Sequence, residues 1–198
     1  MPNILSCVVV VSATCRMVKV SNATMPDWFN TALVSLKPRR SSLIWLLLAA
    51  LVILLDLGSK AWISSHLFYG QRIEVLPVFD LVLLHNTGAA FSFLANAGGW
   101  QRWFFVLLAL VASLVIYGWL NRLQPSEKIT ALALALILGG ALGNLHDRFF
   151  YGYVVDFLAV HWNQRYFPAF NIADAGITVG AVLLIWQSFF GKEAQRSN

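Results

Sequence analysis

Two aspartates are the candidates for chemistry in this sequence, because each lies among apolar residues with no basic residue close by in the chain. Asp156 lies within the apolar run 154–157, and Asp174 follows the segment 170–173. Burying two ionised carboxylates is costly unless they share a proton, and sharing splits their titration into a low and a high step. In such a pair, the ionised partner takes a proton from water while the protonated partner polarises a carbonyl group. The two residues could therefore hydrolyse a peptide bond without a metal or a covalent intermediate.

The same two aspartates also have structural interpretations. Either could pair with Arg148, and Asp174 is near a predicted helix start, where a carboxylate is favoured. A carboxylate at membrane depth can also relay protons. From the residues alone, catalysis, proton relay and ion pairing remain open.

Other polar residues are spaced so that they can join the aspartates. Asn144 and Arg148 are four residues apart and share a helical face, while Asn171 and Asp174 are three residues apart.

Other catalytic chemistries have weaker support. No His-Glu-x-x-His zinc motif is present, and the 4 histidines show no ligand spacing. No Gly-x-Ser-x-Gly elbow marks a nucleophile, although Ser64 or Ser92 could meet a histidine in space. We expect neither a metal nor another cofactor.

The elements that must position these residues are membrane helices. Four apolar runs, at about 43–63, 103–120, 129–146 and 171–190, each approach the roughly 20 residues that a helix needs to cross a bilayer. With four spans, the end of the first, the end of the third and the start of the fourth emerge on one side of the membrane. This brings one set of polar residues to a single interface: Asp56, Lys60, Asn86, Asn144, Asp147, Arg148, Asp156, Asn171 and Asp174.

Local patterns within the spans have packing interpretations. Asp56 and Lys60 are one turn apart, and an ion pair that neutralises two charges at membrane depth is at least as good an interpretation as catalysis. The Gly-x-x-x-Gly patterns at 139–143 and 176–180 allow close approach of neighbouring helices.

The links between the spans predict a small sheet and the orientation of the chain in the membrane. Residues 72–75 alternate and 81–84 are apolar, which predicts a β-hairpin or small sheet in the first outer loop. The second outer loop, 146–168, is rich in aromatic residues that favour the membrane interface. Basic residues before the first span, after the second and after the fourth indicate that both termini are cytoplasmic: Lys37, Arg39, Arg40, Arg122, Lys128, Lys192 and Arg196.

The predicted fold class is therefore membrane all-α, a bundle of four transmembrane helices with a small β-hairpin or sheet in the first outer loop. We expect residues 1–40 to be a cytoplasmic leader that is disordered or follows a mis-assigned start. Residues 41–191 form the membrane domain, and 192–198 a cytoplasmic tail.

Composition agrees with a membrane protein. The 198 residues are 59% hydrophobic and only 12% charged, and the mean hydropathy is +0.69. The formal charge of +5 is scattered between apolar runs, which favours contact with anionic lipids and argues against nucleic-acid binding. Cys7 and Cys15 both precede the first long span, so no disulfide organises the bundle.

The polar motifs resemble those of one family, the lipoprotein signal peptidases (signal peptidase II), over about residues 43–190. Five ordered segments carry the resemblance: Asp56-x-x-x-Lys60, Asn86-Thr87-Gly88-Ala89-Ala90-Phe91, Gly139-Gly140-Ala141-Leu142-Gly143-Asn144-Leu145-x-Asp147-Arg148, Val154-Val155-Asp156-Phe157 and Phe170-Asn171-Ile172-Ala173-Asp174. Only the leader is longer than is usual in the family.

The resemblance implies an aspartic endopeptidase of the bacterial inner membrane whose catalytic pair is Asp156 and Asp174. It implies a supporting role for Asn86, Gly88, Asn144, Asp147, Arg148 and Asn171, and a role in the fold for Asp56 and Lys60. The substrate would be a prolipoprotein that carries diacylglycerol on its cysteine and is cut just before that cysteine, near the outer face. Its lipid chains could stay in the bilayer, and the segment 71–92 and the loop 149–153 could clamp the peptide.

Two other classes of protein remain as rivals. A small transporter or proton-relay protein would also use membrane carboxylates, but its site is usually near the midplane of repeated halves, and no repeat is visible here. A non-enzymatic scaffold would bind a partner helix through the glycine faces.

Overall fold

Four long helices and four short strands make up the part of the chain that the computed structural model describes, residues 40–88, 98–163 and 165–194. In chain order they are α2 (Arg40–His66), β1 (Arg72–Leu76), β2 (Phe79–Asn86), α3 (Trp100–Leu120), α4 (Lys128–Phe150), β3 (Val154–Trp162), β4 (Arg165–Tyr166) and α5 (Ile172–Ala194). Each helix contains a segment long and apolar enough to cross a membrane. The predicted fold class is confirmed. The leader up to residue 39 and the last part of the tail, 195–198, lie outside the described residues.

The outer faces of the helices are apolar. Large hydrophobic side chains such as Leu47 on α2, Leu107 and Leu114 on α3 and Trp186 on α5 are exposed. A water-soluble protein rarely exposes so continuous an apolar surface. In a bilayer these side chains meet lipid tails, so the exposed surface agrees with the membrane assignment.

Helix α4 is the centre of the bundle and packs against α2, α3 and α5. Its glycines allow this, because a Cβ added at Gly139 would lie 2.7 Å from the backbone oxygen of Ala49, and one at Gly140 would collide with the backbone oxygen of Ala173. On α5, a Cβ at Gly180 would lie 2.6 Å from a backbone oxygen of α4. The packing interpretation of both glycine patterns is confirmed.

The strands form one antiparallel sheet in the order β1-β2-β3-β4. The predicted hairpin between the first two spans is β1 and β2, and the sheet is larger than predicted because the link between α4 and α5 adds β3 and β4. Strand β3 pairs with β2 so that Asp156 lies opposite Leu84. No apolar alternation marks β3, because its first four residues are all buried.

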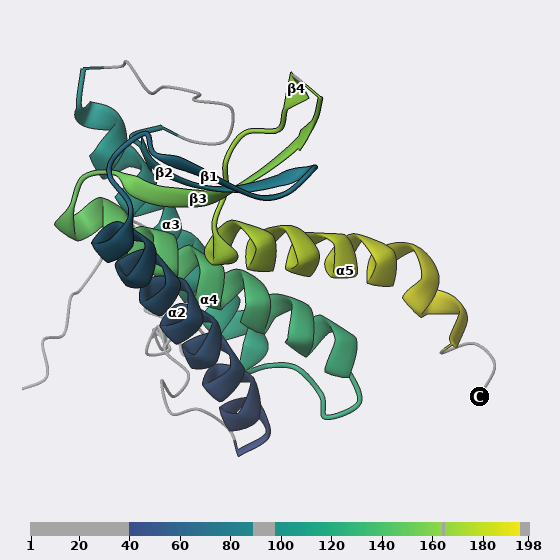
Figure 1. The fold of residues 1–198 in the computed structure, drawn as a ribbon. Helices are drawn as coiled ribbons and strands as arrows, with labels where there is room; N and C mark the ends of the chain where they lie inside the picture. The colour runs from purple at the N-terminus through teal and green to yellow at the C-terminus, as the bar shows by residue number, and fades with distance from the viewer. Residues whose placement is uncertain (1–39, 89–97, 164, 195–198) are drawn as a thin grey trace, which may run out of the picture. The chain divides into compact units, whose positions relative to one another are not determined.

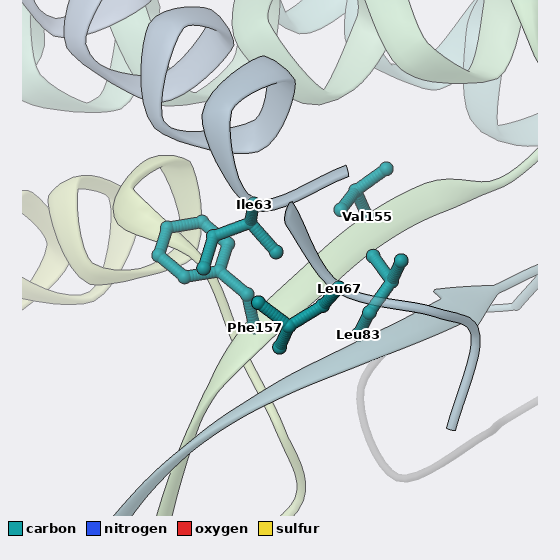
Figure 2. Packing of buried hydrophobic residues seen from close by; sticks show 5 residues of the cluster. All are labelled: Ile63, Leu67, Leu83, Val155 and Phe157. Carbon is teal, nitrogen blue, oxygen red and sulfur yellow. The ribbon is translucent and has the colours of Figure 1, made fainter. Parts of the chain in front are cut away.

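A small apolar core attaches the sheet to the helix ends (Figure 2). Ile63 in the last turn of α2 and Leu67, which directly follows the helix, pack against Leu83 of β2 and against Val155 and Phe157 of β3. The sheet therefore lies across the end of α2 and beside the start of α5 (Figure 1). Because successive strand residues point to opposite faces, the residue between Val155 and Phe157 points away from this core.

Candidate active site

Asp174 is fixed by the first turn of α5. Asn171 directly precedes the helix, and its Oδ1 accepts the backbone N–H of Asp174 at 2.9 Å. In return, Oδ2 of Asp174 accepts the backbone N–H of Asn171 at 3.3 Å. This reciprocal pair satisfies two N–H groups that a helix start leaves unpaired. The helix-cap interpretation of Asp174 is thus correct, and it leaves Oδ1 for other contacts.

Asp156 lies on β3 and is 3% exposed. Its Oδ2 accepts a hydrogen bond from Nδ2 of Asn86 at 3.0 Å, and its Oδ1 accepts one from Nδ2 of Asn171 at 2.8 Å. The side chain of Asn171 therefore contacts both aspartates: Nδ2 donates to the carboxylate of Asp156, and Oδ1 accepts the backbone N–H of Asp174.

Asn144 of α4 supplies the remaining amide donor. Its Nδ2 donates to Oδ1 of Asp174 at 2.7 Å, while its Oδ1 accepts from Nδ2 of Asn171 at 3.3 Å. Each of the four carboxylate oxygens of Asp156 and Asp174 thus has at least one N–H donor from the protein. Such donors fix the orientation of a carboxylate without adding a charge.

Burial and charge set the protonation of Asp156. Burial first, and then the nearby charge of Asp174, raise the pKa of Asp156 from 3.8 to about 7, although hydrogen bonds from Asn86 and Asn171 act in the opposite direction. Close to neutral pH, the pair of aspartates can therefore hold one proton between them. This is the protonation state that general acid–base hydrolysis by two carboxylates requires.

Both aspartates line one cavity of about 870 Å³. The sheet and the turn before it form one wall through Leu84, His85 and Tyr69, and the first turns of α5 form another through Ile177 and Val179. The ring of His85 stacks on Tyr153 with centroids 3.9 Å apart. Burial lowers the pKa of His85 below 6.5, so its ring is neutral at neutral pH and adds no charge to the wall.

Arg148 also lines the cavity, at the end of α4. Its Nη2 donates to the backbone oxygen of Gly88 at 2.9 Å, which ties the chain after β2 to α4. No ion pair of Arg148 with either aspartate is formed within the described residues, although their charges act on it. The guanidinium also lies over the ring of Phe105, 5.1 Å from its centre.

Asp56, Lys60 and Asp147 form a buried ion-pair group behind the cavity. The Nζ of Lys60 lies 2.7 Å from Oδ2 of Asp56 and 2.9 Å from Oδ2 of Asp147. It also donates to Oδ1 of Asn144 at 3.1 Å. The predicted ion pair of Asp56 with Lys60 is confirmed, and the contact of Lys60 with Asp147 goes beyond that expectation.

The residues expected at a single interface all occur in one connected set of contacts around the cavity. The motif residues Ala89, Ala90 and Phe91, and also Ser92, lie outside the described residues. Arg102 was missed by sequence reasoning: its Nε donates to the backbone oxygen of Arg148 at 2.8 Å, so it caps the end of α4. No local pattern distinguishes Arg102, because its partner is distant in the chain. Over the described ranges, no three His, Cys, Asp or Glu side chains are grouped to hold a metal ion.

Comparison with known proteins agrees with the fold. Residues 48–190 match the family model described as signal peptidase (SPase) II. A lipoprotein signal peptidase of Pseudomonas aeruginosa (strain UCBPP-PA14) is 53% identical over 158 residues, which cover 79% of this chain and 94% of that protein. One from Ectopseudomonas mendocina (strain ymp) is 54% identical over 153 residues, or 76% of this chain and 90% of that protein.

A solved structure described as a bacterial membrane enzyme, determined by the in meso method at 2.3 Å resolution, is similar in fold. It has a TM-score of 0.68 and 29% identity, and the match covers 78% of this chain and 92% of that one. The fold and these similarities define a multi-pass membrane peptidase. The chain belongs to the signal peptidase II family.

Proposed function

We propose that this protein is an intramembrane aspartic endopeptidase that removes the signal peptide from bacterial prolipoproteins. Membership of the signal peptidase II family and the relatives named lipoprotein signal peptidase support this function. The proposed substrate carries diacylglycerol on its cysteine, and the cut falls just before that cysteine. The observation that carries the proposal is the pair of aspartates that line one cavity and interact through their charges.

Asp156 and Asp174 are the proposed catalytic residues, and their surroundings suggest different roles. Asp156 is the more deeply buried, so it holds the shared proton and donates it toward the scissile carbonyl oxygen. Asp174, at the positive end of the α5 dipole, takes a proton from the attacking water. The water oxygen bonds to the carbonyl carbon and gives a tetrahedral intermediate. Asp174 then passes its proton to the amide nitrogen as the C–N bond breaks, and Asp156 takes its proton back from the intermediate as the carbonyl group re-forms.

The amides of Asn86, Asn144 and Asn171 are proposed to hold the two carboxylates in this arrangement. Fixed donors lower the cost of reorganisation during the reaction. Arg148 holds the chain at Gly88 beside the cavity and places a positive charge near the two acids. Asp56, Lys60 and Asp147 support the site from behind.

The proposed substrate path runs between the sheet and α5. The wall formed by Ile177 and Val179 is apolar and lies on a helix whose outer face meets lipid, so acyl chains can remain in the bilayer beside it. The opposite wall carries Tyr69 and His85, whose rings are 4.9 Å apart. We propose that the segment 71–92 and the loop 149–153 cover the peptide, which crosslinking of a lipopeptide to these two segments would test.

The proposed location is the bacterial inner membrane, with both termini in the cytoplasm and the cavity near the outer face. The basic residues that flank the spans support this orientation through the positive-inside rule. Membrane lipids and lipid-modified precursors are the proposed partners.

The test is cleavage of a synthetic precursor by the purified protein in lipid, with and without diacylglycerol on the cysteine, followed by mass spectrometry. We expect cleavage directly before the cysteine and a strong preference for the lipidated peptide. Equal cleavage of both peptides, or a cut elsewhere, would exclude the proposed specificity. The absence of any cleavage would exclude the function.

A further inference from the structure

The buried group Asp56, Lys60 and Asp147 is more closely connected to the aspartate pair than a general fold-stabilising role requires. Lys60 has three N–H hydrogens, and its three acceptors are Oδ2 of Asp56, Oδ2 of Asp147 and Oδ1 of Asn144. All four residues are buried. The ammonium therefore has its full set of partners and holds side chains of α2 and α4 together.

Each carboxylate of this group also holds the backbone next to one of the aspartates. Oδ1 of Asp56 accepts the backbone N–H of Ala173 at 2.9 Å, one residue before Asp174. Oδ2 of Asp147 accepts the backbone N–H of Val155 at 3.2 Å, one residue before Asp156. The two contacts are equivalent in kind, although one is made to α5 and the other to β3.

Asn144 adds a third connection. Its Oδ1 accepts hydrogen bonds from Lys60 and Asn171, which leaves its Nδ2 directed at Oδ1 of Asp174. If Lys60 were removed, the amide would lose one of the two donors that fix its orientation. Lys60 is thus connected to Asp174 through a side chain and to both aspartates through the backbone.

We propose that Asp56, Lys60 and Asp147 form a spacing clamp, in which Lys60 sets the separation of Asp156 and Asp174 by drawing two backbone-anchored carboxylates to one ammonium. The two aspartates come from different elements, which Asn171 joins on one side through its side chain, and the clamp holds the backbone of both elements on the other side. Two carboxylates share a proton only at short range. In this role Lys60 is a positioning residue that does not touch the substrate, and the inference rests on the proposed function.

Lys60→Met tests the clamp because methionine has a similar length but no charge or donor. We expect kcat on the lipidated precursor to fall by on the order of a hundredfold, because a small displacement of reacting groups is costly. KM should stay within about threefold, because Lys60 is absent from the cavity wall. The pH profile of kcat/KM should narrow, because separated carboxylates interact less and the two apparent pKa values of the pair move together.

A charge-balanced variant separates geometry from electrostatics. The group carries two negative charges and one positive charge, a net charge of −1, when all three side chains are ionised. Lys60→Met combined with Asp147→Asn leaves only Asp56 and keeps that net charge, and the new amide oxygen can still accept the N–H of Val155. The charged groups that still face the two aspartates are then Asp56 from α2 and Arg148 from α4, and His85 from β2 is neutral. Their summed charge is the same as in the unmodified protein. We expect the double variant to fold, to lose as much kcat as Lys60→Met does, and to show the same narrowing of the pH profile of kcat/KM.

The control is Ser42→Ala on the same helix. Ser42 is buried at the other end of α2 from Lys60, and its hydroxyl donates to Oδ1 of Asn121 at 2.7 Å. Its loss should lower thermal stability and leave kcat and the width of the pH profile unchanged.

A double variant with the kcat and pH-profile width of the unmodified protein would overturn the clamp, since only the net charge of the group, and not the contacts of Lys60, would then matter. If Lys60→Met does not fold, the double variant decides the question. Failure of the unmodified protein to cleave would instead reject the proposed function, so the two failures are distinguishable.

Discussion

Asp156 experiences opposing influences on its pKa. Burial and the charge of Asp174 favour the neutral acid, whereas amide donors from Asn86 and Asn171 favour the carboxylate. The first two prevail, and the pKa of Asp156 is about 7. A neutral acid is therefore available under conditions in which an ordinary aspartate is ionised.

The first prediction concerns activity and pH. Because the shared proton is lost as pH rises through the raised pKa of Asp156, kcat/KM should fall by about tenfold per pH unit above roughly 7. Initial cleavage rates of the lipidated precursor across a pH series would check this. Constant activity well into the alkaline range would mean that no proton on the pair is needed.

The second prediction concerns stability and pH in Asp156→Asn. The folded-state pKa of Asp156 is raised from 3.8 to about 7, so its stabilising contribution is complete below 3.8 and is lost as pH rises through about 7. The amide does not titrate. The stability of the variant relative to the unmodified protein should therefore rise between these values, by at most a few kcal/mol. Thermal unfolding in lipid at several pH values would measure this, and parallel curves would contradict it.

At the scale of elements, the α4–α5 contact determines where Asp174 meets Asn144. In Gly140→Ala the new Cβ would meet the backbone oxygen of Ala173, which cannot move without moving the start of α5. We predict a loss of about 1–3 kcal/mol of stability and a fall in kcat. Gly118→Ala is the matched control, because an added Cβ there has nothing within 4 Å. Thermal unfolding and cleavage assays would check both, and equal effects of the two substitutions would refute the argument.

The helices could be predicted from the sequence, because long apolar runs have one solution in a bilayer. The number of spans also predicted which polar residues meet, because the end of the first, the end of the third and the start of the fourth span must lie on the same side of the membrane. The extent of the sheet could not be predicted, because β3 is buried along its first four residues and lacks alternation. The spacing of Asp56 and Lys60 predicted their ion pair, yet the contacts with Asp147 and Ala173 depend on how the helices are rotated against each other, which spacing alone does not specify.

At the scale of the whole molecule, orientation is the open prediction. Cys7 and Cys15 would first be replaced by serine, and single cysteines introduced as Glu74→Cys on β1 and Ser126→Cys in the link between α3 and α4. Both positions are exposed. With both termini in the cytoplasm, an impermeant thiol reagent should label the first variant in intact cells and the second only after lysis. The opposite pattern would place the sheet and the cavity on the cytoplasmic side.

The central claim is that two carboxylates from β3 and α5 carry out the hydrolysis together. Its most direct test is single-turnover cleavage of the lipidated precursor by Asp156→Asn and Asp174→Asn, with unfolding curves that show both variants to be folded. Because neither acid can replace the other, each substitution should reduce the rate by at least about 10⁴-fold, and the double variant should lose little more. Cleavage at the unmodified rate by either folded variant would contradict the account.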